Sequence, residues 1–548
     1  MNLETDAELP QAEESIPEVT MEQKPNEGPS DSMKDDLEVS PSCSNDSSIG
    51  EIFYNDEPDF LEMQRVNNII KAAYKEFMAI AMRANALIFH PPAVGSVEDL
   101  QEMFHTTPPR GYTVECSVEY DVLSITPESL ITIMMNGVIW SSIFSNIICD
   151  GSFENVLTPL KEFWSADSNS NSKDVVLVNA QLRLPAEFLP RWCTRFLRFK
   201  MDVAEDTWAI CDVSTDYFME TASDSTVGTQ YRRRPSGVVI RQFGVLSEVL
   251  WVENAEVQEI DIPNNISSKV TSNFHLTAKQ WISILSQNLK RRWSKITTSE
   301  MFDDPNDVPD LLTIGENLKR LYLTSVNPFP LERKWDLYCD DNIRILRDMK
   351  ANNIGYNHDY VASSTVYIPE TPIRLLMFLA TYNVTYQLTS IKSPEQLKLV
   401  AALYSEDNSY TIGLRRKVEE TVADELFADH EFFLQEATAN DYCSLVLSSQ
   451  LSEEDVHISL MPKFSMNSVF LRPSGFAIMP AEQGGLHSKA SLVTIFIRRE
   501  LEYIEDDHAI AVMRSHMSDV IDQMTNIHLQ TLQLRTQNRK LLKRYSKL

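Results

Sequence analysis

The sequence lacks the short motifs by which most enzymes and metalloproteins are recognised. It contains no G-x-S-x-G, no H-E-x-x-H, no glycine-rich phosphate loop and no Cys/His set with metal-ligand spacing. Glycine is scarce, with 15 residues in 548, and the ten histidines are scattered. The adjacent carboxylates Asp506 and Asp507 precede an amphipathic segment, which favours a helix N-terminus over acid–base chemistry. We therefore predict that the protein is not an enzyme and uses neither a cofactor nor a metal.

Paired cysteines and long apolar segments are absent as well. The seven cysteines form no C-x-x-C pair, which favours a reducing compartment and cysteines used as small apolar core residues. The first residues carry no basic, apolar leader, and the uncharged stretch 129–149 holds polar residues such as Asn136 and Asn146 that a lipid-facing helix excludes. We expect no transmembrane segment and a location in the nucleus, with the cytoplasm as the alternative.

The net charge of −30 is unevenly distributed along the chain. Residues 1–50 hold 13 Asp or Glu against two Lys, whereas the 26 residues from Gln523 onward hold six bases and no acid. The acidic segment has too few apolar residues to offset its ordering entropy. We predict a disordered acidic tail over residues 1–58 and a basic helical tail over residues 526–548. The bases could aid nuclear import, contact phosphates, or simply end a solvated helix.

The tetrapeptide Arg-Pro-Ser-Gly occurs twice, at Arg234–Gly237 and at Arg472–Gly475. Each copy leads into a short apolar strand, then a second strand-like stretch, and then an amphipathic helix. This repeated order indicates two related α+β modules in tandem.

Periodicity outlines the first module over residues 59–296. An amphipathic helix begins near Phe60 and ends before Pro91, an alternating strand covers 112–123, and Thr126-Pro127-Glu128 starts another helix. Strands are predicted at 175–184, 193–201, 207–215, 236–243 and 247–260, before a final helix that opens at Leu276-Thr277.

The second module is predicted over residues 310–525, after a polar linker at 297–309. Its helices are expected at 310–325 and 373–388 and from Asp506 onward. Its strands are expected at 360–368, 430–438, 442–451, 454–461, 475–480 and 490–501.

Segments Leu189–Phe199, Glu205–Ser214, Arg232–Gly237, Trp251–Val257 and Leu471–Pro480 follow one another in a fixed order. This series resembles the START lipid-binding domain and START-associated domain of plant class IV homeodomain-leucine zipper transcription factors, over roughly residues 60–525. The resemblance implies an α+β START-type helix-grip domain, a curved antiparallel sheet closed by a C-terminal helix, followed by a second, diverged START-like domain. Only an acidic tail stands where that family carries its homeodomain, so we expect no homeodomain and no direct DNA binding.

A sheet closed by one helix can enclose an apolar cavity that suits a sterol, a phospholipid or another lipid. The resemblance would place Trp281, Ile284 and Leu285 of the closing helix on that cavity. Trp208, Trp251 and Phe274 would add to its wall. The same six side chains could instead fill a solid core.

The three adjacent arginines Arg232, Arg233 and Arg234 could hold an anionic headgroup, because guanidinium groups recognise phosphate in a bidentate manner. A solvated turn before Pro235 is the simpler expectation, since three adjacent side chains cannot all point inward.

The last helix carries a heptad pattern. Ile510, Met517, Met524, Thr531 and Asn538 alternate with Met513, Val520, Ile527, Leu534 and Leu541 at 3–4 spacing, with an asparagine at an a-type position. We expect the first half to pack on the second module's sheet. The second half, through Ile527, Leu534, Asn538 and Leu541, would form a homodimer or a heterodimer with homeodomain-zipper relatives, or remain an unpaired helix.

These observations predict a START-type protein that binds a hydrophobic ligand and serves as a regulator of transcription. The alternative is a protein-interaction module with filled cores, which dimerises with full-length relatives and needs no ligand.

Overall fold

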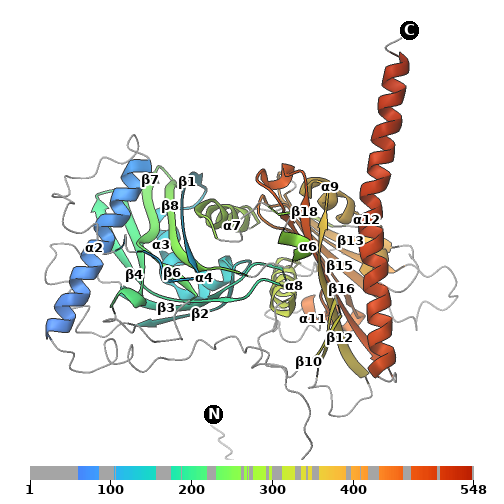
Figure 1. Cartoon of the computed structure of the whole chain (residues 1–548), viewed down its shortest axis with the longest axis horizontal. Helices are drawn as coiled ribbons and strands as arrows, with labels where there is room; N and C mark the ends of the chain where they lie inside the picture. The colour runs from blue at the N-terminus through green and yellow to red at the C-terminus, as the bar shows by residue number, and fades with distance from the viewer. Residues whose placement is uncertain are drawn as a thin grey trace, which may run out of the picture. The chain divides into compact units, whose positions relative to one another are not determined.

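The computed structural model describes two antiparallel sheets with helices on both faces (Figure 1). The residues that it describes are 60–84, 104, 107–155, 175–186, 188–218, 230–260, 264–267, 269–270, 276–291, 295–298, 311–326, 335–340, 343–348, 357–389, 397–407, 409–417, 431–460, 471–502 and 506–545. All of them belong to one compact unit, residues 45–548.

The first module is built on an eight-stranded antiparallel sheet. The strand order is β1-β8-β7-β5-β4-β3-β2, with β6 also paired to β8. Its strands are β1 (Tyr112–Leu123), β2 (Ile148–Asn155), β3 (Val175–Leu182), β4 (Trp192–Ala204), β5 (Thr207–Ser214), β6 (Tyr231–Arg233), β7 (Ser236–Phe243) and β8 (Leu246–Gln258). Its helices are α2 (Phe60–Ala84), α3 (Pro127–Met135), α4 (Gly137–Ile143), η1 (Thr215–Phe218), α6 (Asn264–Ser267) and α7 (Ala278–Arg291).

The second module has a ten-stranded antiparallel sheet in the order β10-β11-β12-β18-β17-β16-β15-β14-β13-β9. Its strands are β9 (Lys295–Thr298), β10 (Trp335–Asp340), β11 (Ile343–Asp348), β12 (Asn357–Ile368), β13 (Leu397–Tyr404), β14 (Tyr410–Lys417), β15 (Phe432–Thr438), β16 (Ser444–Leu451), β17 (Ser474–Pro480) and β18 (Ser491–Glu502). Its helices are α8 (Leu311–Val326), α9 (Pro372–Leu379), α10 (Tyr382–Thr389), α11 (Glu453–Leu460), η5 (Gly485–His487) and α12 (Asp506–Tyr545).

The two sheets share one topology. The path β1-β8-β7-β5-β4-β3-β2 corresponds strand for strand to β12-β18-β17-β16-β15-β14-β13, and the second sheet adds strands at both edges. The prediction of two related α+β modules is therefore confirmed.

The two Arg-Pro-Ser-Gly segments occupy equivalent places at the start of β7 and β17. Gly237 pairs with Val252 of β8, and Gly475 pairs with Phe496 of β18. The hydroxyl of the serine before each glycine accepts a hydrogen bond from a backbone N–H of the next strand. Ser236 accepts from Asn254 N at 3.0 Å, and Ser474 accepts from Arg498 N at 3.1 Å. Each of these N–H groups lies two residues beyond the residue that pairs with the glycine.

The arginines of the two segments are equivalent as well. Arg234 pairs with Glu256 of β8 at 2.8 Å, and Arg472 pairs with Glu500 of β18. Each carboxylate lies four residues beyond the residue that faces the glycine. The tetrapeptide thus makes the same contacts between two paired strands in both modules, β7 with β8 and β17 with β18.

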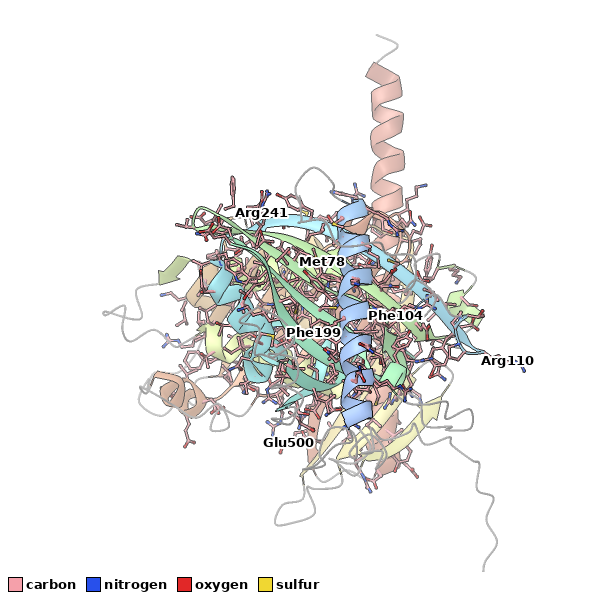
Figure 2. The ribbon with its side chains drawn as sticks, turned by 90° about the vertical axis from the view of Figure 1, so that its left-hand side faces the viewer. Met78, Phe104, Arg110, Phe199, Arg241 and Glu500 are labelled. Atoms are coloured by element: carbon pink, nitrogen blue, oxygen red, sulfur yellow. The ribbon has the colours of Figure 1, made fainter. Side chains whose placement is uncertain are left out.

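In each sheet one face carries a helix from the start of its module. On the first sheet, α2 packs through Ile70, Ala73 and Phe77 against Leu250 and Val252. Figure 2 shows α2 crossing this outer face, with Met78 on the helix and Phe104 and Phe199 in the layer below it. On the second sheet, α8 takes the same role, with Tyr322 packed edge-on against Phe496 at 5.5 Å.

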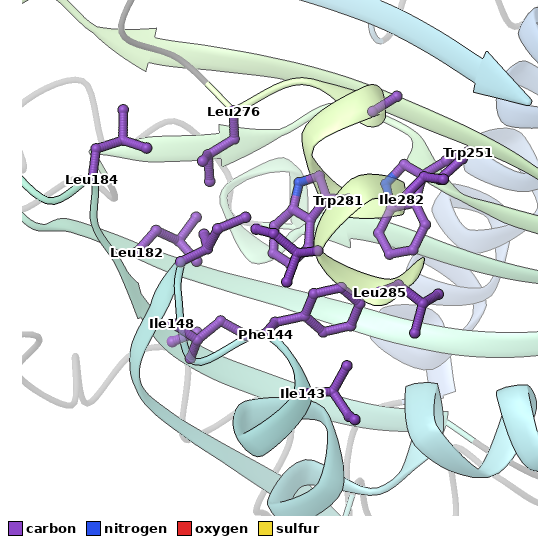
Figure 3. Packing of buried hydrophobic residues seen from close by; sticks show 14 of the residues in the cluster. Ile143, Phe144, Ile148, Leu182, Leu184, Trp251, Leu276, Trp281, Ile282 and Leu285 are labelled. Atoms are coloured by element: carbon purple, nitrogen blue, oxygen red, sulfur yellow. The ribbon is translucent and has the colours of Figure 1, made fainter. Parts of the chain in front are cut away.

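The opposite, inner face of each sheet is closed by the last helix of the module. Trp281 and Leu285 of α7 pack with Trp251 on the first sheet (Figure 3). On the second sheet, Met513, Met517 and Met524 of α12 are buried. The predicted closing helices are confirmed, as is the packing of the first half of the last helix on the second sheet.

Both modules begin their inner-face helices with proline at the first position. Thr126 caps α3 through a 3.4 Å bond from Ser129 N, and Pro127 follows. Thr371 and Pro372 occupy the same positions in α9. Proline suits this position because its missing N–H would have no partner in the first helical turn.

Several expectations were wrong. Of the strand expected at 454–461, residues 454–460 lie in a helix, α11, because Ser452 and Asp455 form reciprocal capping bonds at its start, and residue 461 lies outside the described residues. The helix expected at 373–388 is two helices, α9 and α10. Strand β9 falls partly within the predicted linker.

The cysteines are not all core thiols. Cys211 is buried and free, and Cys116 is exposed and free, but Cys193 is disulfide-bonded, which the sequence did not predict.

Candidate functional site

The predicted cavity residues gather on the inner face of the first sheet. Trp251, Trp281, Ile284 and Leu285 are all buried in one cluster. Trp208 is only half-buried; it lies on β5 two residues from buried Ile210, on the same face of the strand. Phe274 lies outside the described residues.

Three tryptophans form a stack under α7. The ring of Trp281 lies between those of Trp251 and Trp140, with centroids at 5.5 and 6.2 Å and interplanar angles of 10° and 14°. Phe144 meets Trp281 edge-on at 5.0 Å. Figure 3 shows Trp281 on α7 surrounded by the apolar side chains of Phe144, Ile148 and Leu182. Trp140, from the uncharged segment 129–149, had not been predicted to belong to this site.

Beside this stack lies a buried group of charges, which we call the inner charge cluster: Arg198, Asp212, Arg233 and Glu253. Each is at most 1% exposed. Arg198 donates two hydrogen bonds to the Asp212 carboxylate, at 2.7 and 2.8 Å. Arg233 joins Asp212 to Glu253, the latter at 3.4 Å. Two cations and two carboxylates therefore balance one another in the core.

Polar and aromatic neighbours complete the coordination of the cluster. Tyr231 donates to Glu253 Oε1 at 2.8 Å, and Arg198 donates to the Met134 carbonyl at 2.8 Å. The guanidinium groups lie over aromatic rings, Arg198 at 4.8 Å from Trp140 and Arg233 at 5.2 Å from Trp281. Cation–π contacts of this kind are strongest where water is excluded.

Burial shifts the proton equilibria of the cluster. Burial raises the pKa of Glu253 above its ordinary value, although Arg233 opposes the shift. Burial alone would lower the pKa of Arg233, but the carboxylates of Glu253 and Asp212 outweigh it and raise that pKa. The pKa of Tyr231 lies well above its ordinary value, first through burial and then through Glu253, so its phenol remains a donor.

The three adjacent arginines alternate between the two faces of the sheet. Arg233 points to the inner charge cluster, whereas Arg232 and Arg234 both pair with Glu256, at 3.0 and 2.8 Å. The expectation of a solvated turn was wrong, because these residues form β6 and its continuation. Strand alternation sends only the middle side chain inward.

Three indole donors on the inner face have no acceptor. The N–H groups of Trp140, Trp192 and Trp281 are buried and make no hydrogen bond within the described residues, whereas Trp251 donates to Glu253 at 3.4 Å. An unpaired buried donor costs about 1–3 kcal/mol of stability. Such donors are therefore places where a bound molecule would be stabilised.

The second module has lost this cluster. Shared register makes Gln435 the counterpart of Arg198, Ser448 of Asp212, Leu471 of Arg233 and Ile497 of Glu253. Gln435 still donates toward the Leu379 carbonyl at 3.4 Å, as Arg198 does toward that of Met134. The charges are thus a property of the first module alone.

The predicted dimerisation residues Ile527, Leu534, Asn538 and Leu541 lie on α12, which continues to Tyr545. The surroundings of their side chains lie outside the described residues, so their role stays a prediction.

Two kinds of feature are absent from the residues that the structure describes. No group of three or more His, Cys, Asp or Glu there is placed to hold a metal ion. Within the same part of the chain, no helix combines the length and the apolar character needed to cross a membrane.

Similar proteins are found among plant sequences. The homeobox-leucine zipper protein HDG1 of Arabidopsis thaliana is 24% identical over 78% of this chain and 53% of that protein. ANTHOCYANINLESS 2 of the same plant is 22% identical over 72% of this chain and 48% of that protein. ROC4 of Oryza sativa subsp. japonica is 24% identical over 70% and 50%. The chain spans about half the length of the curated relatives that it matches.

No protein-family model matches the chain. Among solved structures, the di-domain ARO/CYC BexL from the BE-7585A biosynthetic pathway aligns over 76% of this chain and 97% of that one, at 7% identity. The TM-score is 0.19, which is too low to establish a shared fold.

Proposed function

Since this chain is homologous to the class IV homeobox-leucine zipper proteins of plants, we propose that it is a regulator of transcription whose first module binds a hydrophobic ligand. The ligand would lie between the inner face of the first sheet and α7. The nucleus remains the expected location.

The unpaired indole donors of Trp140 and Trp281 carry this proposal. They lie among apolar walls, so the best ligand has an apolar body and one hydrogen-bond acceptor that reaches these donors. Burial of each methylene group contributes about 0.8 kcal/mol, so a sterol or a long acyl chain could offset the cost of association.

A neutral acceptor fits the site better than an anionic headgroup. Arg232, Arg233 and Arg234 each already pair with carboxylates. An anion would have to displace these partners and leave buried carboxylates unpaired, which is costly. We therefore propose a ligand with a hydroxyl or carbonyl group.

Trp281→Phe should weaken this binding, because it keeps an aromatic ring but removes one unpaired donor. Native mass spectrometry of the full chain should show a lipid-sized adduct on the natural protein. The adduct fraction should fall about tenfold in the variant, as expected for the loss of one buried hydrogen bond. Solvent extraction then identifies the adduct.

Trp251→Phe is the matched control, since the Trp251 indole already donates to Glu253. It removes a similar volume from the same stack but takes no donor from the ligand. A bare natural chain, or equal loss of the adduct in both variants, would contradict the proposed contact.

A second candidate function, dimerisation, is favoured by the length of α12. The helix spans 40 residues, and the last of its described side chains in the core is Met524. The remaining turns carry the heptad residues Ile527 and Leu534. These turns extend beyond the part of α12 that packs on the second sheet.

Truncation after Asn526 should convert a dimer to a monomer and leave any ligand in place. The cut keeps Met524, which is fully buried, so the second module stays closed. Size-exclusion chromatography with light scattering measures the mass of both proteins. A natural chain that is monomeric at micromolar concentration would refute dimerisation, whatever its ligand content.

A further inference from the structure

Helix α7 is shared by the two modules. Through Trp281, Leu285 and Asn288 it covers the inner face of the first sheet, where Asn288 donates to the Ile143 carbonyl at 2.7 Å. Through residues on another side it contacts the second module. A movement of α7 away from the first sheet therefore has to be made against both sets of contacts.

The contacts with the second module follow helical spacing. Ser283 accepts from Asn440 at 2.9 Å, and Gln287 donates to the Ala439 carbonyl at 3.0 Å. One turn further on, Lys290 pairs with Asp407 at 3.0 Å. The last pair is exposed and contributes little to stability.

The strongest contact is made by Arg291, the last residue of α7. Its guanidinium is 6% exposed and enters the second module between α8 and the sheet. It donates to the Tyr410 hydroxyl at 2.7 Å, pairs with Glu316, and lies 3.4 Å from Glu436. Glu436 is completely buried, and Arg291 of the first module compensates this carboxylate together with the buried Lys319.

Local packing is arranged around this arginine. A Cβ on Gly315 would come within 2.9 Å of both Arg291 Nη2 and Glu436 Oε2, so glycine leaves the space in which they meet. Lys319 is buried beside them and pairs with Glu316 at 3.1 Å. Burial and then Arg291 lower the pKa of Lys319, whereas burial raises that of Glu436.

Chain connectivity holds the same end of the helix. Only three residues separate Arg291 from β9, which pairs with β13 at the edge of the second sheet. The C-terminal end of α7 is thus attached to the second module by a strand as well as by a buried ion pair.

We propose that the second module clamps α7 onto the inner face of the first sheet, so that access to this face requires release of Arg291 from Glu436. The control of ligand access rests on the proposed function, whereas the attachment of α7 to the second module does not. Coupling of this kind is reciprocal: a ligand that moves α7 would weaken the docking of the second module.

A pocket lies where the contacts of α7 with the second module adjoin the core under α7. Its volume is about 560 Å³, and it lies between the end of β1, the end of α7 and the turn after β13. Leu123 and Leu289 line this pocket and also belong to the core under α7. Lys290 and Asp407 lie on its other walls. Displacement of this end of α7 would open the pocket toward the stacked tryptophans.

Arg291→Met in the full chain tests the clamp. Hydrogen exchange of the 278–291 amides should accelerate about tenfold or more, the effect of losing one buried charged hydrogen bond, while exchange in β3 and β4 stays unchanged. Uptake of the fluorescent sterol NBD-cholesterol, a neutral ligand with one hydroxyl group, should accelerate by a similar factor. Lys290→Met, which removes only the exposed pair, should leave both rates within about twofold.

The double variant Arg291→Met/Glu436→Met guards against misfolding, because it removes the buried carboxylate to which the single variant leaves only Lys319 as a nearby cation. It should show the same faster exchange. Unchanged α7 exchange in both variants would overturn the clamp. Faster exchange with no NBD-cholesterol uptake by any protein would support the clamp and defeat the ligand proposal. Equal rates of probe uptake in the natural protein and in all variants would contradict only the control of access to the inner face, and not the clamp itself.

Discussion

Replacement of Arg198 by glutamine should destabilise the first module by about 3–5 kcal/mol, the usual cost of breaking a buried ion pair from one side. Asp212 would lose both bonds from Arg198 and keep only Arg233, while remaining 1% exposed. Urea unfolding followed by tryptophan fluorescence measures the effect, since Trp140, Trp251 and Trp281 all lie beside the cluster.

The second module supplies the matched control. The fourfold variant Arg198→Gln, Asp212→Ser, Arg233→Leu and Glu253→Ile copies the residues that stand at these places in the second sheet. Removing all four charges together leaves none uncompensated, so most of the lost stability should return. If the fourfold variant is as unstable as Arg198→Gln, the charges do more than compensate one another. A loss below about 1 kcal/mol in the single variant would show that Asp212 is not desolvated.

The same four residues show where sequence reasoning ends. The strands that carry Arg198, Asp212 and Glu253 were predicted to within a few residues, because apolar alternation marks a half-buried strand. Strand β6, which carries Arg233, was not predicted. Arg198 and Asp212 are 14 residues apart and meet only through the β4–β5 register. Glu253 joins them from β8. A charge at an inward position of an apolar strand was the available signal, but its partner depends on pairings that periodicity does not reveal.

Three of the predicted cavity residues lie together on the inner face for a different reason. Trp281, Ile284 and Leu285 follow from the helical period of α7, which one sequence shows directly. Trp140 was missed because its segment was considered only as a possible membrane span. Its place in the stack follows from the short helices α3 and α4, which fold back under α7.

The error at α11 has a local explanation. Residues 454–461 alternate in polarity like a strand, yet Ser452 begins a Ser-x-x-Asp capping pattern and three acids fill the first turn. The cap outweighed the alternation. That signal was present in the sequence and was not used.

Alanine at Gly237 or Gly475 should cost about 3 kcal/mol or more of stability in the module that carries it. Both glycines have positive φ, 142° and 157°. A Cβ would lie 2.0 Å from the Ile210 carbonyl oxygen at Gly237, and 2.2 Å from that of Val446 at Gly475. These contacts are with the backbone of the neighbouring strand, so relief requires the sheet itself to separate.

Gly244 provides the control within the same hairpin. Its φ is +63°, but a Cβ there would meet nothing within 4 Å, so alanine should cost only about 1 kcal/mol of backbone strain. Thermal and urea unfolding of the three variants separate strain from collision. Equal effects at Gly237 and Gly475, both well above that at Gly244, would show that the repeated tetrapeptide sets the same strand crossing in both modules. A cost at Gly237 no larger than at Gly244 would mean that the strands can separate freely, and the tetrapeptide would then have no structural role.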